Sequence, residues 1–241
     1  MLKPLNWAVA RTSTLLQVVC APESAFTGRL DGPSYLLPLV ILGLSFALLS
    51  LLQAPLSIQW AQHQMSAAGA PKEQVAASMD MMLKAHRWAV AFVPPLLLLK
   101  WLFVATGLWL MSRLFLANVG FSRLLSIVAY SYFPMLLRET ALLSILWMRG
   151  REALHQPDAM NVAIGLDLLL PRLPLPWSTL IGNLNIFEFW YVALLTVGLS
   201  KAAGTSRQKA LAMTLPNWLF ALLIQFGFVS LTLSLRSSLG L

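Results

Sequence analysis

Five apolar stretches decide what this chain of 241 residues can fold into. Each is about 20 residues long or longer, the length that an α-helix needs to cross the hydrocarbon core of a membrane. Backbone polar groups in lipid must be satisfied within the segment itself, so helices are the expected form. The predicted spans cover residues 35–56, 88–112, 124–148, 185–203 and 214–235.

The expected fold is therefore an all-α integral membrane protein with a bundle of five transmembrane helices. We assign residues 1–34 to an N-terminal interfacial segment and 35–235 to the bundle, so that 1–241 form a single membrane domain. Only 11% of the residues are charged, against about 25% in soluble domains. So few charges do not cover a surface that faces water.

The formal net charge of +8 does not indicate a nucleic-acid partner, because the cations stand singly at the ends of apolar segments. The positive-inside rule predicts cations at such places, and membrane lipids are the expected surroundings. Cys20 is the one cysteine, so an intrachain disulfide is excluded. Val19 stands where a lipoprotein signal has a small residue, which argues against lipidation of Cys20.

The short links between spans predict the orientation of the chain. Arg113 and Arg123 flank the link between the second and third spans, and the link between the fourth and fifth carries Lys201, Arg207 and Lys209. Neither link contains an acid, as the positive-inside rule expects for cytoplasmic links. We expect a multi-pass protein of the inner (cytoplasmic) membrane with its N-terminus in the cytoplasm.

Two segments are expected to lie at the membrane surface without crossing it. In residues 5–30 we expect an amphipathic helix, a break at "APES", and a short helix that begins at Pro22. Val18 and Phe26 are among the apolar residues expected in the headgroup plane. Between the third and fourth spans, residues 159–183 are too apolar for a free loop and too rich in proline to span. An interfacial helix followed by an extended Pro-rich piece fits best there.

Four charged residues within the predicted spans are the candidate functional residues, because a charge at the bilayer centre costs at least about 2.5–3.5 kcal/mol. This candidate intramembrane charge network consists of Lys100, Arg138, Glu139 and Glu188.

Glu188 follows Asn185 in "NIFE", which has the spacing of a capping box. We expect Asn185 to cap the helix and Glu188 to oppose the positive end of the helix dipole. An ion pair across helices and a role in proton or substrate handling are the alternatives for Glu188.

Lys100 lies near the middle of the second predicted span. We expect it to face the bundle and meet an acid, with Glu139 as the first choice and Glu188 as the second. One alternative is a helix that begins at Pro94, which would move Lys100 toward an interface. The other is a direct role in transport.

The third predicted span carries Arg138 and Glu139 after Pro134. Adjacent helical residues point about 100° apart, so we do not expect these two charges to pair with each other. Pro134 has no N–H to donate to the Tyr130 carbonyl, so we expect it to kink the helix. Arg138 would then bind freed carbonyls or a partner acid; the alternative is a helix that ends near Leu137.

The sequence offers no pattern typical of a catalytic or cofactor site. His63, His86 and His155 are scattered over the segments between spans, and with one cysteine no metal cluster is predicted. Phosphate-binding loops, nucleophile elbows and zinc-protease motifs are absent from the sequence. We expect no enzyme activity and no cofactor.

Several segments taken in order resemble the Yip family, the membrane domain of the Ypt-interacting proteins. "VCAPESAFTGRL" is similar to the entry of that family, and "FSRLLSIVAYSYFPMLL" is similar to its third helix. "NIFEFWYVALLTVGLSKAAGTSRQKALAM" resembles its fourth helix and the entry to the fifth. The chain resembles the short bacterial form, without a long N-terminal cytosolic region.

This resemblance implies a five-helix membrane bundle with a cytoplasmic N-terminus and no enzyme activity. Some bacterial relatives are linked to ABC-type (MacB-like) exporters, which makes such an exporter, or a second copy of this chain, the expected partner. The first functional hypothesis is thus a non-enzymatic scaffold or accessory subunit of a membrane assembly. The alternative is a small-molecule or lipid transport protein that uses its intramembrane charges.

Overall fold

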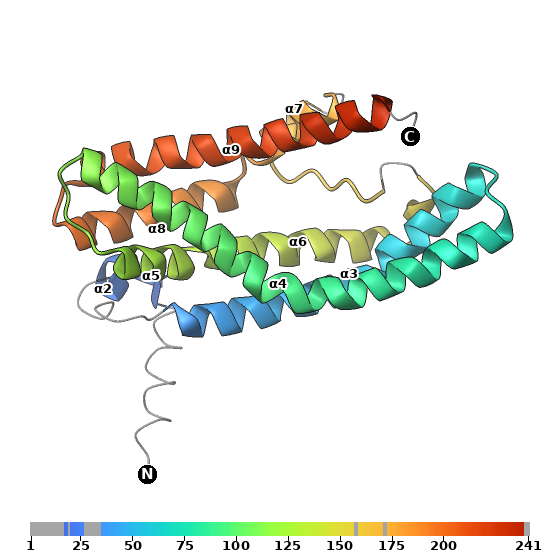
Figure 1. The fold of residues 1–241 in the computed structure, drawn as a ribbon, viewed down its shortest axis with the longest axis horizontal. Coiled ribbons are helices and arrows are strands. Elements are labelled where there is room, and N and C mark those ends of the chain that lie inside the picture. The colour runs from blue at the N-terminus through green and yellow to red at the C-terminus, as the bar shows by residue number, and fades with distance from the viewer. Residues whose placement is uncertain (1–16, 19, 27–34, 157–158, 171–172, 239–241) are drawn as a thin grey trace, which may run out of the picture. The chain divides into compact units, whose positions relative to one another are not determined.

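In the computed structural model, every element of the described residues is helical (Figure 1). The structure describes residues 17–18, 20–26, 35–156, 159–170 and 173–238. The elements are α2 (Pro22–Phe26), α3 (Leu36–Ala67), α4 (Lys72–Leu114), α5 (Phe121–Ser131), α6 (Phe133–Arg149), the 3₁₀ helices η1 (Arg151–His155) and η2 (Leu166–Leu169), α7 (Leu175–Gly182), α8 (Ile186–Ala203) and α9 (Arg207–Ser238).

Among the described residues, four helices are long and apolar enough to cross a membrane: α3, α4, α8 and α9. The predicted third span, 124–148, is instead divided between α5 and α6, which have 11 and 17 residues. The prediction of an all-helical membrane protein is confirmed, whereas the count of five spans is not.

The first two spanning helices extend well beyond the apolar stretches that predicted them. Residues 57–67 continue α3, and residues 72–87 form the start of α4. These segments are rich in Ala, Gln, Met and Lys, which favour helix even where no lipid surrounds them. The turn between the helices uses Gly69, whose φ of +78° is a backbone angle that glycine adopts without strain.

Two compact units form within the chain. The first consists of residues 1–38, 99–135 and 163–241, and the second of residues 39–98 and 136–162. The prediction of a single domain stays a prediction, and we describe each unit by itself.

In the second unit, α3 and α4 form a hairpin. His86 of α4 makes a hydrogen bond of 2.9 Å between its Nε2 and the carbonyl oxygen of Ser50 of α3. At Gly43 the two helices approach so closely that an added Cβ would lie 3.2 Å from Cβ of Pro94.

In the first unit, α8 packs against α2, α5 and α9 (Figure 1). Gly198 allows the close approach of α5, because a Cβ at this position would lie 2.6 Å from Cγ2 of Ile127. The aromatic ring of Phe26 lies against the same glycine. The short α2 is thereby fixed onto the C-terminal part of the fourth predicted span.

The structure describes parts of both predicted interfacial segments. Pro22 begins α2 as predicted. Val18 and Phe26 are buried inside the protein, and their placement in the headgroup plane stays a prediction. Most of the amphipathic helix expected before Pro22 lies outside the described residues. In the Pro-rich segment the helix α7 begins directly after Pro174, which is its N-cap. Pro176 lies in the first turn of α7, where a missing N–H costs nothing.

Candidate functional site

A cluster of aromatic rings occupies the first unit where the predicted third span breaks. The ring of Tyr132 meets Trp101 of α4 edge-on, with the centroids 5.9 Å apart. It meets Tyr191 of α8 in the same way at 5.6 Å. Such edge-to-face pairs add about 0.5–1.5 kcal/mol beyond the burial of their area. We call Trp101, Tyr132 and Tyr191 the aromatic cluster.

The break in the helix places Tyr132 in this cluster. Tyr132 is the C-cap of α5, and Pro134 lies in the first turn of α6. The amide of Met135 donates to the carbonyl of Tyr132 at 3.0 Å, which starts the new helix. We expected a kink in one continuous helix at Pro134. The structure has two helices instead, because the missing N–H of proline ends the ladder at this point.

Lys100 lies beside the aromatic cluster. Its ammonium stands 5.2 Å from the centroid of the Tyr132 ring, within the range of a cation–π interaction. Glu139 belongs to the other compact unit, so the pairing of Lys100 with an acid stays a prediction.

Three buried polar atoms in this region have no hydrogen-bond partner within the described part of the chain. They are Nε1 of Trp101, Oγ of Ser131 and the hydroxyl of Tyr191. Trp101 is fully buried, and Ser131 directly precedes Tyr132. A buried donor without a partner costs about 1–3 kcal/mol, so each of these atoms lowers the stability of the region unless a hydrogen-bond partner reaches it.

Glu188 and Asn185 lie at the start of α8. The side-chain oxygen of Asn185 accepts hydrogen bonds from the amides of Phe187 and Glu188, each at 3.0 Å. The carboxylate of Glu188 accepts a hydrogen bond of 3.3 Å from Nε1 of Trp218 on α9. Asn185 thus caps the helix, while Glu188 connects α8 to α9.

Asn185→Ala should lower the free energy of unfolding by about 1 kcal/mol, the usual loss of an N-cap. The amide oxygen that receives two backbone N–H groups would be removed, and the site is almost fully buried. Thermal unfolding in a mild detergent would measure the change. Asn161→Ala, at an exposed position, is the control and should leave stability unchanged.

Arg138 and Glu139 contact each other, contrary to prediction. Nη1 of Arg138 lies 3.6 Å from Oε1 of Glu139. The expectation of no pairing was wrong because it considered only the direction of the Cα–Cβ bonds. The long, flexible arginine side chain reaches around the helix surface. The carboxylate is 40% exposed, so this pair contributes little to stability.

Several polar side chains that connect helices are not among the candidate residues predicted from the sequence. Nδ2 of Asn217 on α9 donates to the carbonyl of Val104 on α4 at 3.3 Å. Nδ2 of Asn183 donates to Oε1 of Gln225 at 3.2 Å. Amides within an apolar helix usually bind a neighbouring helix, so the sequence carries a signal for these contacts that a search limited to charged residues does not detect.

An ion-pair cluster connects α2 to the link between α8 and α9. Oε2 of Glu23 lies 3.3 Å from Nζ of Lys201, and its other oxygen pairs with Arg207. The side chains are 35–66% exposed, so the energy gained is small. The geometric consequence is larger, because these contacts hold α2 beside the link between α8 and α9.

The model of the Yip1 domain matches residues 16–229 of this chain. The chain belongs to the Yip1 domain family. A search of curated proteins and a search of solved structures each gave no significant match.

The match runs from before α2 to residue 229 within α9, and so includes every residue of the aromatic cluster in this Yip1-domain protein. The resemblance noted from the sequence segments is thereby confirmed. Together with four helices apolar enough to span, membership of the family indicates a multi-pass membrane protein.

Proposed function

We propose that this Yip1-domain protein is a non-enzymatic scaffold or accessory subunit of a membrane assembly. One observation supports this proposal above the others. Polar side chains on the spans of the first unit bind neighbouring helices, as Glu188 does with Trp218 and Asn217 with the carbonyl of Val104. Groups that hold helices together build a rigid framework, whereas a transporter would leave such groups for its substrate.

The proposed partner is an ABC-type (MacB-like) exporter of the inner membrane, and self-association is the second choice. The apolar surface of α9 supports an intramembrane partner, because only 6% of its most apolar window is buried within the chain. Lipid or helices of a partner would cover this surface.

The proposed orientation has the N-terminus in the cytoplasm. The ion pairs of Glu23 place α2 on the side of Lys201 and Arg207, and cation-rich short links favour the cytoplasm.

Lys209→Cys in a Cys20→Ser background should react with a membrane-impermeant maleimide only after the cells are opened. The α3–α4 turn should lie on the opposite side, so Ala70→Cys should react in intact cells. Labelling of Lys209→Cys in intact cells would contradict the proposed orientation.

Glu188→Gln should preserve the function of a scaffold. Glutamine retains an oxygen that accepts from Trp218, so α8 and α9 stay connected. In a deletion strain, wild-type and Glu188→Gln chains should restore exporter activity equally and co-purify with the exporter in a mild detergent. Glu139→Gln, in the exposed pair, is the matched control. A folded Glu188→Gln chain without activity would favour transport, and failure of the wild-type chain to co-purify would contradict the proposed partner.

Transport of a small molecule or lipid is the second candidate function. The buried polar atoms of Trp101, Ser131 and Tyr191 favour it, because they offer hydrogen bonds to a polar guest. Under this alternative, Tyr191→Phe would abolish transport while the protein stays folded. Under the scaffold proposal the same change leaves activity unaltered, since it removes only a hydroxyl that has no hydrogen-bond partner among the described residues.

A further inference from the structure

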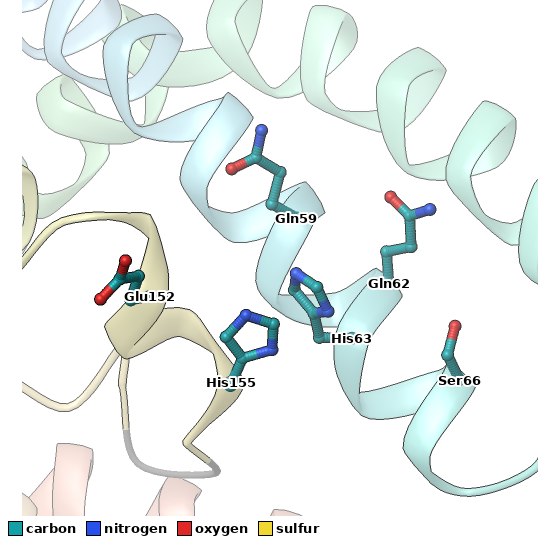
Figure 2. Close-up of a pocket in the computed structure, with 6 residues that line it drawn as sticks. All are labelled: Gln59, Gln62, His63, Ser66, Glu152 and His155. Atoms are coloured by element: carbon teal, nitrogen blue, oxygen red, sulfur yellow. The ribbon is translucent and has the colours of Figure 1, made fainter.

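A polar pocket of about 530 Å³ lies in the second unit, between the C-terminal part of α3 and the 3₁₀ helix η1. It is lined by Gln59, Gln62, His63, Ser66, Glu152 and His155. The lining residues of α3 follow the apolar part of that helix, so the pocket lies beyond the stretch expected in lipid. Two of the three histidines of the chain meet here (Figure 2).

The spacing of the lining residues explains why they share one pocket. On α3 they stand at relative positions 0, 3, 4 and 7, which form one face of an α-helix. On η1, Glu152 and His155 are three residues apart, and residues at this spacing eclipse each other in a 3₁₀ helix. Each element therefore presents its lining residues to the same space.

The two imidazoles are close together and open to solvent. The ring centroids of His63 and His155 are 4.1 Å apart, with an angle of 55° between the ring planes. Figure 2 shows the rings side by side, with the Glu152 side chain projecting from the same η1 segment as His155. Both histidines are exposed, so an ion from solution can reach their nitrogens.

The two walls of the pocket are fixed to each other by buried contacts. Leu154 of η1 packs in an apolar cluster with Leu56 of α3 and Leu146 of α6. Nε1 of Trp60 on α3 donates to the carbonyl of Gln156 at 3.2 Å. The histidines thus sit on a supported framework, which limits the entropy lost when a ligand binds.

We propose that His63 and His155 bind a divalent transition-metal ion such as Zn²⁺, Ni²⁺ or Cu²⁺. Imidazole nitrogen suits these ions, whereas Mg²⁺ and Ca²⁺ prefer shells of oxygen. Within the described residues, no three His, Cys, Asp or Glu side chains are grouped as a metal site. The proposed site therefore has two protein ligands, with water at the other positions. The site is independent of the proposed scaffold function.

The experiment is a titration of the full-length, purified chain in detergent with Zn²⁺ alone, followed by isothermal calorimetry, using a tag without histidine. The wild-type chain should bind one ion. His63→Ala and His155→Ala should each weaken binding at least tenfold. His86→Ala is the matched control, because His86 lies in the same unit but is bound to the Ser50 carbonyl, away from the pocket. It should bind Zn²⁺ like the wild type.

A second measurement counts the ligands directly. Electron paramagnetic resonance of the Cu²⁺-loaded chain should show hyperfine coupling to two imidazole nitrogens, reduced to one in His63→Ala. Because His63 is an exposed position on a helix, alanine should not impair folding there. Circular dichroism of the metal-free variants checks this. Equal Zn²⁺ affinity in wild-type and His63→Ala chains, or loss of binding in His86→Ala alone, would overturn the proposal.

Discussion

Trp101→Ala is expected to lower the free energy of unfolding by about 3–5 kcal/mol, the usual cost of removing a large buried aromatic side chain. Trp101 is fully buried and packs edge-on against Tyr132. Its loss leaves a cavity at the break between α5 and α6. Unfolding in mixed micelles, followed by far-ultraviolet circular dichroism, would measure the effect.

Trp88→Ala is the matched control, because Trp88 lies on the same helix and is 71% exposed. It should change the free energy of unfolding by less than about 0.5 kcal/mol, as expected for surface substitutions. The effect of Trp101→Phe on the free energy of unfolding should fall between those of Trp101→Ala and Trp88→Ala. This change also removes Nε1, which has no hydrogen-bond partner among the described residues. Equal effects of Trp101→Ala and Trp88→Ala would show that the aromatic cluster does not stabilise the fold.

The apolar lengths predicted the membrane class, because lipid restricts the backbone to a few forms. The apolar stretches did not predict where α3 ends or where α4 begins. There the polar residues 57–67 and 72–87 stay helical through intrinsic preference and through packing of the hairpin. Hydropathy measures what suits lipid, and it carries no information on where a helix continues into water.

The sequence predicted the position of the break near Tyr132 but not its form. Pro134 marked the place, but the choice between a kink and two separate helices depends on tertiary contacts. Tyr132 leaves the helical ladder and packs against Trp101 and Tyr191, which come from distant parts of the sequence. No local pattern identifies such partners.

The contacts of the candidate residues also divide into those that local spacing predicts and those that depend on the fold. The capping by Asn185 depends on a spacing of three residues, so the sequence alone suggested it. The contact of Glu188 with Trp218, the pairing of Glu23 with Lys201, and the meeting of His63 with His155 each join residues far apart in the chain. Their recognition requires the fold.

Gly107→Ala should destabilise the protein by about 1–3 kcal/mol, the usual cost of overpacking. An added Cβ would overlap with Oδ1 of Asn217 and lie 2.8 Å from its Cγ. The amide of Asn217 would have to move and lose its bond to the Val104 carbonyl. A loss of stability would be informative, because the helix preference alone favours alanine over glycine by about 1 kcal/mol. Gly227→Ala on α9 is the control and should be neutral or stabilising, because no atom of the described residues lies within 4 Å of an added Cβ.

A double-mutant cycle separates this contact from general effects on the helix. Asn217→Ala alone should cost about 1 kcal/mol, since it removes one hydrogen bond between helices. The double variant Gly107→Ala, Asn217→Ala should be more stable than Gly107→Ala alone, because the second change removes the atoms that the new methyl group overlaps. The coupling energy should be about 1–3 kcal/mol, as for residues in direct contact. Additive effects of the two changes would mean that α4 and α9 do not meet at these residues.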